Sequence, residues 1–445
     1  MNRPQITVII LAVLAAGVPT VARAAGAPGQ SGEVTTALPE PPPGGIVFDL
    51  KYRGLDTPDD PLSYHSFWGW GGYGDGNDPF VRAVKSQVKE CTVVFNGSLP
   101  RAKWSVVELK DKMPVAFYFD LDADGKLSAN EKFLPVASSN PAARDSYTFI
   151  TSDFLIRTAD NREVPFRVML VGDASRAEEV SYMWSPCCIL EGQTSLGGEP
   201  MRLLLYSQGF PGTFTWFGRS SFMLVPASKK LEGFLPRNTL SSLIYHDRTF
   251  YRLKVYGSHE KGKTVRVVLE KDTTPTGDMA VDVAGKDPLK TRLAQTTILG
   301  ARDTSIEFDL AGVPPALPIG QYKLGSTDVT YGLQSDEQWR LRVNEGPAFD
   351  IQAGQTSRIK LGEPALSIRA IAEQDRYKSD VKERSTYAKG TAIYLTPQIK
   401  GKAGEVYMRF SRKNAGSENM TDIKPHLTIV DPGGKQIASA DLEYG

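Results

Sequence analysis

Residues 120–131 carry the most chemically specific pattern in the chain. Three aspartates, Asp120, Asp122 and Asp124, stand at alternate positions, and Glu131 ends the segment. Carboxylates at this spacing can converge on one cation, and a hard ion such as Ca²⁺ prefers about six to eight oxygen ligands. Gly125 allows the sharp turn that such convergence requires. The segment therefore predicts a Ca²⁺ site.

The ligand set is completed by two residues between the aspartates and the glutamate. Lys126 offers its backbone carbonyl, and Ser128 can act directly or through a water molecule. The whole segment resembles the EF-hand calcium-binding loop, whose closing glutamate binds with both carboxylate oxygens. The resemblance implies these Ca²⁺ ligands: Asp120, Asp122, Asp124, Lys126, Ser128 and Glu131. The alternative is an acidic turn that binds no metal.

The flanks of the loop indicate which kind of EF-hand it resembles. Met113–Phe119 is rich in β-branched and aromatic residues and contains a proline, which predicts a strand. Residues 128–134 have room for about two helical turns before Pro135. This order resembles the strand-loop-helix variant of exported bacterial proteins. We expect calcium to stabilise such a protein and not to switch it, because a switch needs a second helix that opens.

A second segment, residues 67–80, is rich in aromatic residues and glycines. Glycines let aromatic rings lie flat at a surface, where they can stack on sugar rings, and the acidic residues that follow can bond hydroxyl groups. The pattern indicates a carbohydrate-binding surface with these candidate residues: Trp68, Trp70, Tyr73, Asp75 and Asp78. The alternative is an aromatic loop packed onto its own domain.

Motifs for catalysis are weak by comparison. Residues 69–74 formally match the glycine pattern of dinucleotide-binding proteins, but no strand leads tightly into them and Trp70 and Tyr73 crowd the turn. The four histidines are scattered, and the chain contains no nucleophile elbow or zinc-protease motif. A binding or surface-structural role is therefore favoured over catalysis. A secreted glycoside hydrolase is the enzymatic alternative, since its paired carboxylates need no sequence motif.

Residues 1–24 have the features of a signal peptide. Arg3 supplies the positive charge, residues 6–17 are apolar but too short to span a bilayer, and Ala22 and Ala24 form a small-residue cleavage signal. Cleavage after Ala24 predicts a secreted, periplasmic or cell-surface protein with no membrane span, and an uncleaved anchor is the alternative. Residues 25–45 then form a Pro/Gly-rich linker.

The charge balance of the chain narrows the class of partner. The chain has 52 Lys and Arg against 51 Asp and Glu, which argues against a nucleic-acid binder. An extracellular polysaccharide or a cell-surface component is the expected partner besides calcium.

Three cysteines are few for an exported protein, so disulfides are not expected to hold the fold. Cys91 could pair with Cys187 or Cys188, or all three could stay reduced.

Short strand-like runs separated by Gly, Pro and Asp turns dominate the rest of the sequence. Many of them alternate apolar and polar residues, and few stretches hold a helical period. We therefore predict a mainly β fold of several antiparallel β-sandwich, immunoglobulin-like units with few short helices. Changes in composition suggest a β-rich domain over residues 46–226, a β-sandwich region over 227–365 and an immunoglobulin-like domain over 366–445.

Overall fold

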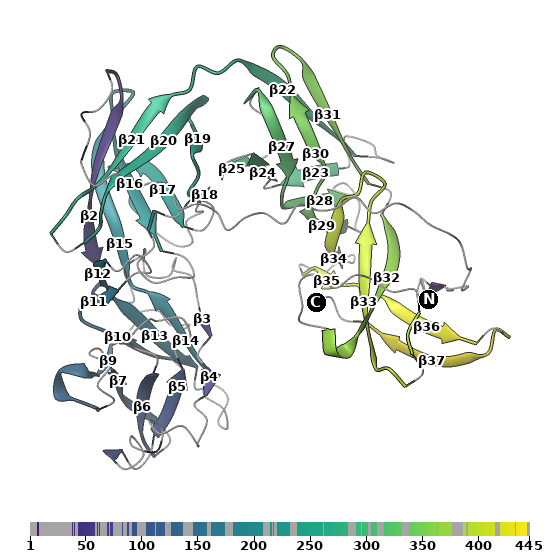
Figure 1. The fold of residues 1–445 in the computed structure, drawn as a ribbon, viewed down its shortest axis with the longest axis horizontal. Coiled ribbons are helices and arrows are strands. Elements are labelled where there is room, and N and C mark those ends of the chain that lie inside the picture. The colour runs from purple at the N-terminus through teal and green to yellow at the C-terminus, as the bar shows by residue number, and fades with distance from the viewer. Residues whose placement is uncertain are drawn as a thin grey trace. The chain divides into compact units, whose positions relative to one another are not determined.

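The computed structural model of the chain is mainly β, with many antiparallel sheets, as the alternation of its residues predicts (Figure 1). Residues 29–272 form one compact unit, and residues 273–445 together with 1–28 form another. We call them the 29–272 unit and the 273–445 unit. The structure describes residues 7–8, 38, 40, 43–57, 60, 62, 69–70, 72–73, 82, 87–88, 91–95, 104–111, 113–120, 126–136, 146–157, 162–173, 181–207, 214–215, 217, 220–231, 238–260, 262–283, 291–294, 296–300, 304–308, 316–331, 338–362, 364–375, 386–388, 390–413, 419–431 and 433–442.

An eight-stranded sheet is the largest element of the 29–272 unit. Its strands follow the order β18 (Asn238–Thr239), β17 (Ser221–Pro226), β16 (Glu199–Tyr206), β15 (Cys188–Leu196), β2 (Ile46–Gly54), β21 (Val265–Lys271), β20 (Thr249–Gly257) and β19 (Leu243–His246). β2 is central because it pairs antiparallel with both β15 and β21. Its alternation buries Phe48 and Leu50 and exposes Asp49 and Lys51, as expected of a strand with one face on the core.

Two five-stranded sheets and one hairpin complete the same unit. One sheet runs in the order β3 (Gly69–Trp70), β14 (Ser181–Pro186), β13 (Val168–Asp173), β10 (Ser146–Ile150) and β9 (Pro135–Val136). The other runs in the order β4 (Gly72–Tyr73), β5 (Cys91–Phe95), β6 (Trp104–Lys110), β7 (Met113–Phe119) and β8 (Lys132–Phe133). The hairpin joins β11 (Phe154–Arg157) and β12 (Glu163–Phe166).

Phenylalanines from these sheets meet in one core. Phe117, Phe149 and Phe166 are buried in the same cluster as Phe48 of the eight-stranded sheet. The rings of Phe117 and Phe149 lie 5.8 Å apart and pack at a tilt, which is a favourable arrangement for aromatic pairs. Apolar faces of different sheets therefore share one interior, so the unit is β-sandwich-like.

In the residues that the structure describes, the 273–445 unit has four sheets. The largest follows the order β23 (Thr291–Ala294), β28 (Thr327–Tyr331), β29 (Gln338–Glu345), β34 (Val406–Lys413), β33 (Ile393–Lys400) and β32 (Ala365–Ala372), with β35 (Thr421–Asp422) beside β34. A second contains β25 (Thr304–Phe308), β24 (Thr296–Gly300), β27 (Gly320–Leu324) and β30 (Ala348–Ile351). The two smaller sheets are β26 (Leu317–Pro318), β22 (Thr276–Val283), β31 (Thr356–Leu361), and β1 (Thr7–Val8), β36 (His426–Val430), β37 (Gln436–Asp441).

The compact units divide the chain at a place different from the boundaries suggested by composition. Position 226/227 falls inside the 29–272 unit, because β2 pairs with β21 and carries residues 243–271 into the eight-stranded sheet. Position 365/366 falls inside a sheet, because β29 pairs with β34 and β32 pairs with β33. Long-range pairing of this kind leaves no mark on local composition.

Helical structure is sparse in the described part of the chain. Single 3₁₀ turns occur at Ala129–Glu131 and Glu373–Asp375, and Arg82 and Gln87 have helical backbone. Over the residues described, the structure contains no helix with the length and apolar character needed to cross a bilayer.

Candidate metal centre

The acidic loop closes a β-hairpin. β7 covers Met113–Phe119, as predicted, and pairs with β6 on one side. On its other side it pairs antiparallel with β8, in the register Phe117↔Phe133 and Tyr118↔Lys132. The chain therefore leaves the sheet at Phe119 and re-enters it at Lys132, so the two ends of the loop lie side by side.

The prediction of a helix after the loop is wrong. Residues 128–134 form one 3₁₀ turn, Ala129–Glu131, and then continue as strand β8. Pairing with β7 supplies the backbone hydrogen bonds that a helix would otherwise make, and the ring of Phe133 packs 6.3 Å from that of Phe117. Tertiary packing here overrides a short local preference.

Two carboxylates are buried at the ends of this loop. Asp120 is 6 % exposed and Glu131 is 1 % exposed. Glu131 Oε2 accepts hydrogen bonds from the Ser128 backbone N–H at 3.1 Å and from the Ser128 hydroxyl at 2.5 Å. This reciprocal capping box fixes the orientation of the Glu131 side chain.

The donor set at the loop fits a hard cation. Burying a carboxylate is unfavourable unless positive charge or hydrogen bonds compensate. Here one acid is buried at each end of an aspartate-rich loop. Asp122, Asp124 and Gly125 lie outside the described residues, whereas Lys126 is described and exposed. Within the described ranges, no cluster of three or more His, Cys, Asp or Glu side chains could hold a metal. Asp120, Lys126, Ser128 and Glu131 are thus the described part of the predicted site.

The aromatic segment bridges two sheets. Trp70 belongs to β3 and pairs in register with Met183, whereas Tyr73 belongs to β4 and pairs with Val94. Of the other predicted ligand-binding residues, Trp68, Asp75 and Asp78 lie outside the described residues. The sheet that contains Tyr73 also carries the hairpin with the acidic loop. The segment is therefore connected through one sheet to the candidate metal centre.

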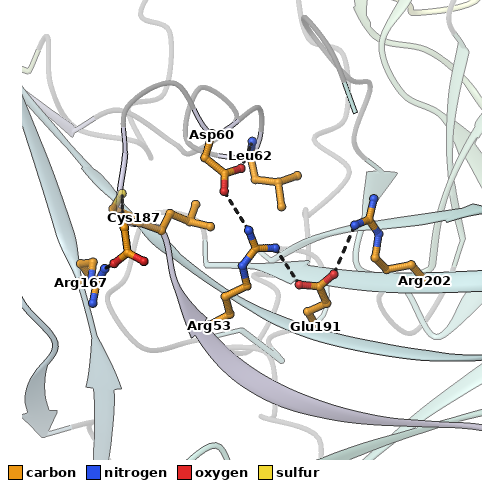
Figure 2. A network of polar contacts seen from close by, with 9 residues as sticks. Arg53, Asp60, Leu62, Arg167, Cys187, Glu191 and Arg202 are labelled. Atoms are coloured by element: carbon orange, nitrogen blue, oxygen red, sulfur yellow. Dashed lines mark hydrogen bonds and ion pairs between the residues drawn. The ribbon is translucent and has the colours of Figure 1, made fainter. Parts of the chain in front are cut away.

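A polar network that sequence reasoning missed lies on the eight-stranded sheet (Figure 2). Arg53 donates to Glu191 Oε2 and to Asp60 Oδ2, each at 2.9 Å. Arg202 lies 3.4 Å from Glu191 Oε1, and Asp60 Oδ1 accepts the backbone N–H of Leu62 at 2.9 Å. Arg53 and Glu191 are 138 positions apart in sequence, so no local pattern could have revealed the contact.

A second guanidinium, that of Arg167, holds another pair of acids. It forms ion pairs with Asp56 and with Asp153, whose Oδ1 lies 2.8 Å from Arg167 Nε. Tyr52 donates its hydroxyl to the same Asp153 oxygen at 2.8 Å. Burial, with smaller effects of Cys188 and Asp153, raises the pKa of Tyr52, so its hydroxyl stays protonated as a donor. Carboxylates bound in this way by arginine are suited to structure and not to acid–base catalysis.

The three cysteines, all of them among the described residues, form no disulfide. Cys187 and Cys188 are adjacent on the chain, yet they pack in different clusters, Cys187 with Leu55 and Cys188 with Phe48. Burial raises the pKa of the Cys188 thiol, which keeps it protonated and unreactive. Of the alternatives left by the sequence, the structure therefore shows the reduced one.

A groove of about 490 Å³ opens beside β2, between the β11–β12 hairpin and the start of β21. Its lining includes the rings of Tyr52 and Phe154 and the polar side chains of Lys51, Asp153 and Thr264. Among the described residues, neither the Lys51 ammonium nor Asp153 Oδ2 has a partner. The groove thus combines aromatic surface with an available donor and an available acceptor.

Searches against protein-family models, curated proteins and solved structures find no match to this chain.

Proposed function

We propose that this chain is an exported calcium-binding protein in which Ca²⁺ has a structural role, within a protein that acts by binding or as a surface component. The observation that carries the proposal is the burial of Asp120 and Glu131 at the two ends of an aspartate-rich loop. A bound cation would compensate both carboxylates and would close the β7–β8 hairpin.

The hairpin supports a structural role for the ion. A calcium sensor opens a pair of helices, whereas this loop runs from one strand to its neighbour in the same sheet. Strands joined by backbone hydrogen bonds have no comparable opening motion. The sequence has this ligand pattern at one segment, and for an unpaired loop we expect an affinity in the extracellular range, on the order of 10⁻⁴ M.

Calorimetric titration of the mature chain with Ca²⁺ tests the proposal. Wild type should take up calcium, and Glu131→Gln should abolish or strongly weaken uptake because it removes the bidentate closing carboxylate. Glu199→Gln is a matched control, since Glu199 is exposed at the β15–β16 turn. Uptake by the Glu131 variant equal to that of wild type would exclude this loop as the calcium site.

Export is the second part of the proposal. It is supported by Arg3, the short apolar stretch and the small residues Ala22 and Ala24. The exported chain should begin near Ala25, which N-terminal sequencing of secreted or periplasmic material can establish. Recovery of intact Met1 from a membrane fraction would favour the anchored form.

Carbohydrate binding is a second candidate function, and the groove beside β2 favours it. Sugars combine an apolar ring face with hydroxyl groups, and the groove offers Tyr52 and Phe154 beside Lys51 and Asp153. Lys51→Ala and Thr264→Ala should reduce retention on polysaccharide, with exposed Lys271→Ala as the control. Trp68→Ala and Trp70→Ala test the aromatic segment separately. Equal retention by all these variants would remove both surfaces from consideration.

A further inference from the structure

Two arginines of β29 share one buried aspartate of β28. In the register of the two strands, Asp328 pairs with Arg342 and Thr330 pairs with Arg340. Arg340 and Arg342 are two positions apart and so lie on the same face of the strand. The intervening Leu341 is buried on the opposite face, against Val329 of β28.

The contacts among the three charged groups are asymmetric. Arg342 binds Asp328 with two nitrogens, Nε at 2.8 Å from Oδ1 and Nη2 at 3.1 Å from Oδ2. Arg340 reaches the same carboxylate through Nη2 alone. The aspartate side chain is only 7 % exposed, whereas those of Arg340 and Arg342 are 43 % and 47 % exposed. One carboxylate therefore holds two guanidinium groups that still face solvent.

This arrangement leaves positive charge and hydrogen-bond donors at the surface. A guanidinium has five N–H donors in about one plane, and Asp328 engages only part of them. Among the described residues, the Nη1 groups of both arginines have no acceptor. Since one aspartate neutralises one arginine, the pair keeps a net positive charge.

Neighbouring strands add basic residues at adjacent register positions. In β34, Arg409 pairs with Arg342 and Lys413 pairs with Gln338, and in β23, Arg292 pairs with Thr330. Besides Asp328, Asp422 of β35 lies at these described register positions, and it accepts the Ser411 hydroxyl at 2.8 Å. Among the paired positions named here, Arg and Lys outnumber Asp.

The aspartate also fixes the orientation of the arginines. Arginine side chains usually lose conformational entropy when they bind an anion, but here Asp328 already restrains both. By contrast, Arg358 pairs one-to-one with Asp282, and their side chains are 65 % and 47 % exposed. The charges of that pair cancel and both side chains are solvated, so the pair has no excess positive charge that could bind an anion.

We propose that the face formed by Arg340 and Arg342 binds an acidic polysaccharide through its carboxylate or sulfate groups. Planar carboxylates match the guanidinium fork and accept two parallel hydrogen bonds. The balanced charge of the whole chain, 52 Lys and Arg against 51 Asp and Glu, argues against nucleic acid, whose binding depends on a broad positive field. The inference is independent of calcium and of the groove beside β2.

Binding of the full chain to polygalacturonate and to heparin, measured at several salt concentrations, tests the proposal. Wild type should bind at low salt and weaken as salt rises. Arg340→Ala with Arg342→Ala should lower affinity at least tenfold, whereas Arg358→Ala, which removes one arginine from the same unit, should leave it unchanged. An equal loss in both cases, or no binding by wild type, would overturn the proposal.

Lysine variants keep the test valid if the alanine variants fold poorly. Arg340→Lys with Arg342→Lys retains the charge but removes the planar fork, so affinity should fall severalfold with an unchanged melting temperature. Affinity fully retained by the lysine variant would contradict recognition by the fork. Binding by wild type only to duplex DNA or to anionic lipid vesicles, and to neither polysaccharide, would also overturn the proposal.

Discussion

Glu131 and Glu405 are both buried beside a β-hairpin turn, but the groups around them differ. Glu405 is fully buried and accepts three hydrogen bonds from the protein: from the Gly362 N–H at 2.7 Å, the Tyr407 hydroxyl at 2.9 Å and the Ala403 N–H at 3.1 Å. Glu131 receives its described bonds from Ser128 and ends a loop that contains three aspartates. Glu405 accepts hydrogen bonds from three neutral donors, whereas Glu131 closes a segment whose sequence contains three further acids.

The difference bears on which buried acid a metal would stabilise. Backbone N–H groups and a hydroxyl from separate segments stabilise an ionised carboxylate without any cation. Acids at alternate positions repel one another when they converge, and a divalent ion would offset that repulsion. Burial of a glutamate is therefore no sign of a metal site by itself. The neighbours of its carboxylate decide between the two roles.

Removal of the Glu405 carboxylate should have the largest effect on stability. Glu405→Ala leaves the buried Gly362 N–H and Tyr407 hydroxyl and the part-buried Ala403 N–H without an acceptor, and we expect a loss of about 3 kcal/mol or more. Tyr407→Phe removes only one of these bonds and should lose about 1 kcal/mol. Urea denaturation monitored by circular dichroism measures the free energy of unfolding of both variants. Equal stability of Glu405→Ala and wild type would contradict the role assigned to this residue.

Calcium should stabilise the region of Glu131 and leave that of Glu405 unaffected. A ligand that binds only the folded state adds about 2.7 kcal/mol at a hundred times its dissociation constant. The melting temperature should therefore rise with calcium in wild type and in Tyr407→Phe, but not in Glu131→Gln. Hydrodynamic radius and binding of a hydrophobic dye should stay level. A large calcium-dependent increase in dye binding would indicate a sensor.

Asp328 extends the comparison to a third kind of buried acid, one held by arginines. Burial raises its pKa, but hydrogen bonds and charge from Arg342 and Arg340 outweigh burial and hold the pKa below the ordinary value. A depressed folded-state pKa stabilises the protein above the unfolded value, near pH 4, and this contribution disappears as the pH falls through the folded value. Asp328→Asn should therefore lose about 1–2 kcal/mol at pH 7 and less at pH 3. Melting curves of both proteins between pH 3 and pH 7 test this expectation. An equal loss of stability at both pH values would contradict the ionic role of Asp328.

Ser128 should show the smallest effect. Ser128→Ala removes one hydrogen bond to Glu131 and half of the capping box, with an expected loss of about 1 kcal/mol. Calcium affinity should fall less than in Glu131→Gln, because the ligating carboxylate remains. Isothermal titration of both variants under one set of conditions makes the comparison. A larger fall in the serine variant would make Ser128 the more important ligand.

Local sequence was sufficient for much of the secondary structure. The strand predicted over Met113–Phe119 occurs with the same bounds, because it combines apolar side chains with clear turn residues at its ends. The apolar residues of 165–171 instead divide at Arg167, between β12 and β13, which belong to different sheets. Arg167 faces Asp56 and Asp153, and no local pattern signals that change of sheet.

The sequence by itself determined the mainly β class and the calcium-loop hypothesis, since both depend on residues close together in the chain. The immunoglobulin-like assignment of residues 366–445 and the carbohydrate surface stay predictions. Only the tertiary structure decided which strands are neighbours, that the acidic loop returns as a strand, and how the buried acids are compensated. Glu405 meets Gly362 across 43 positions, and Arg53 meets Glu191 across 138. Such contacts depend on sheet pairing and shared burial, which act over the whole fold and not along a short segment.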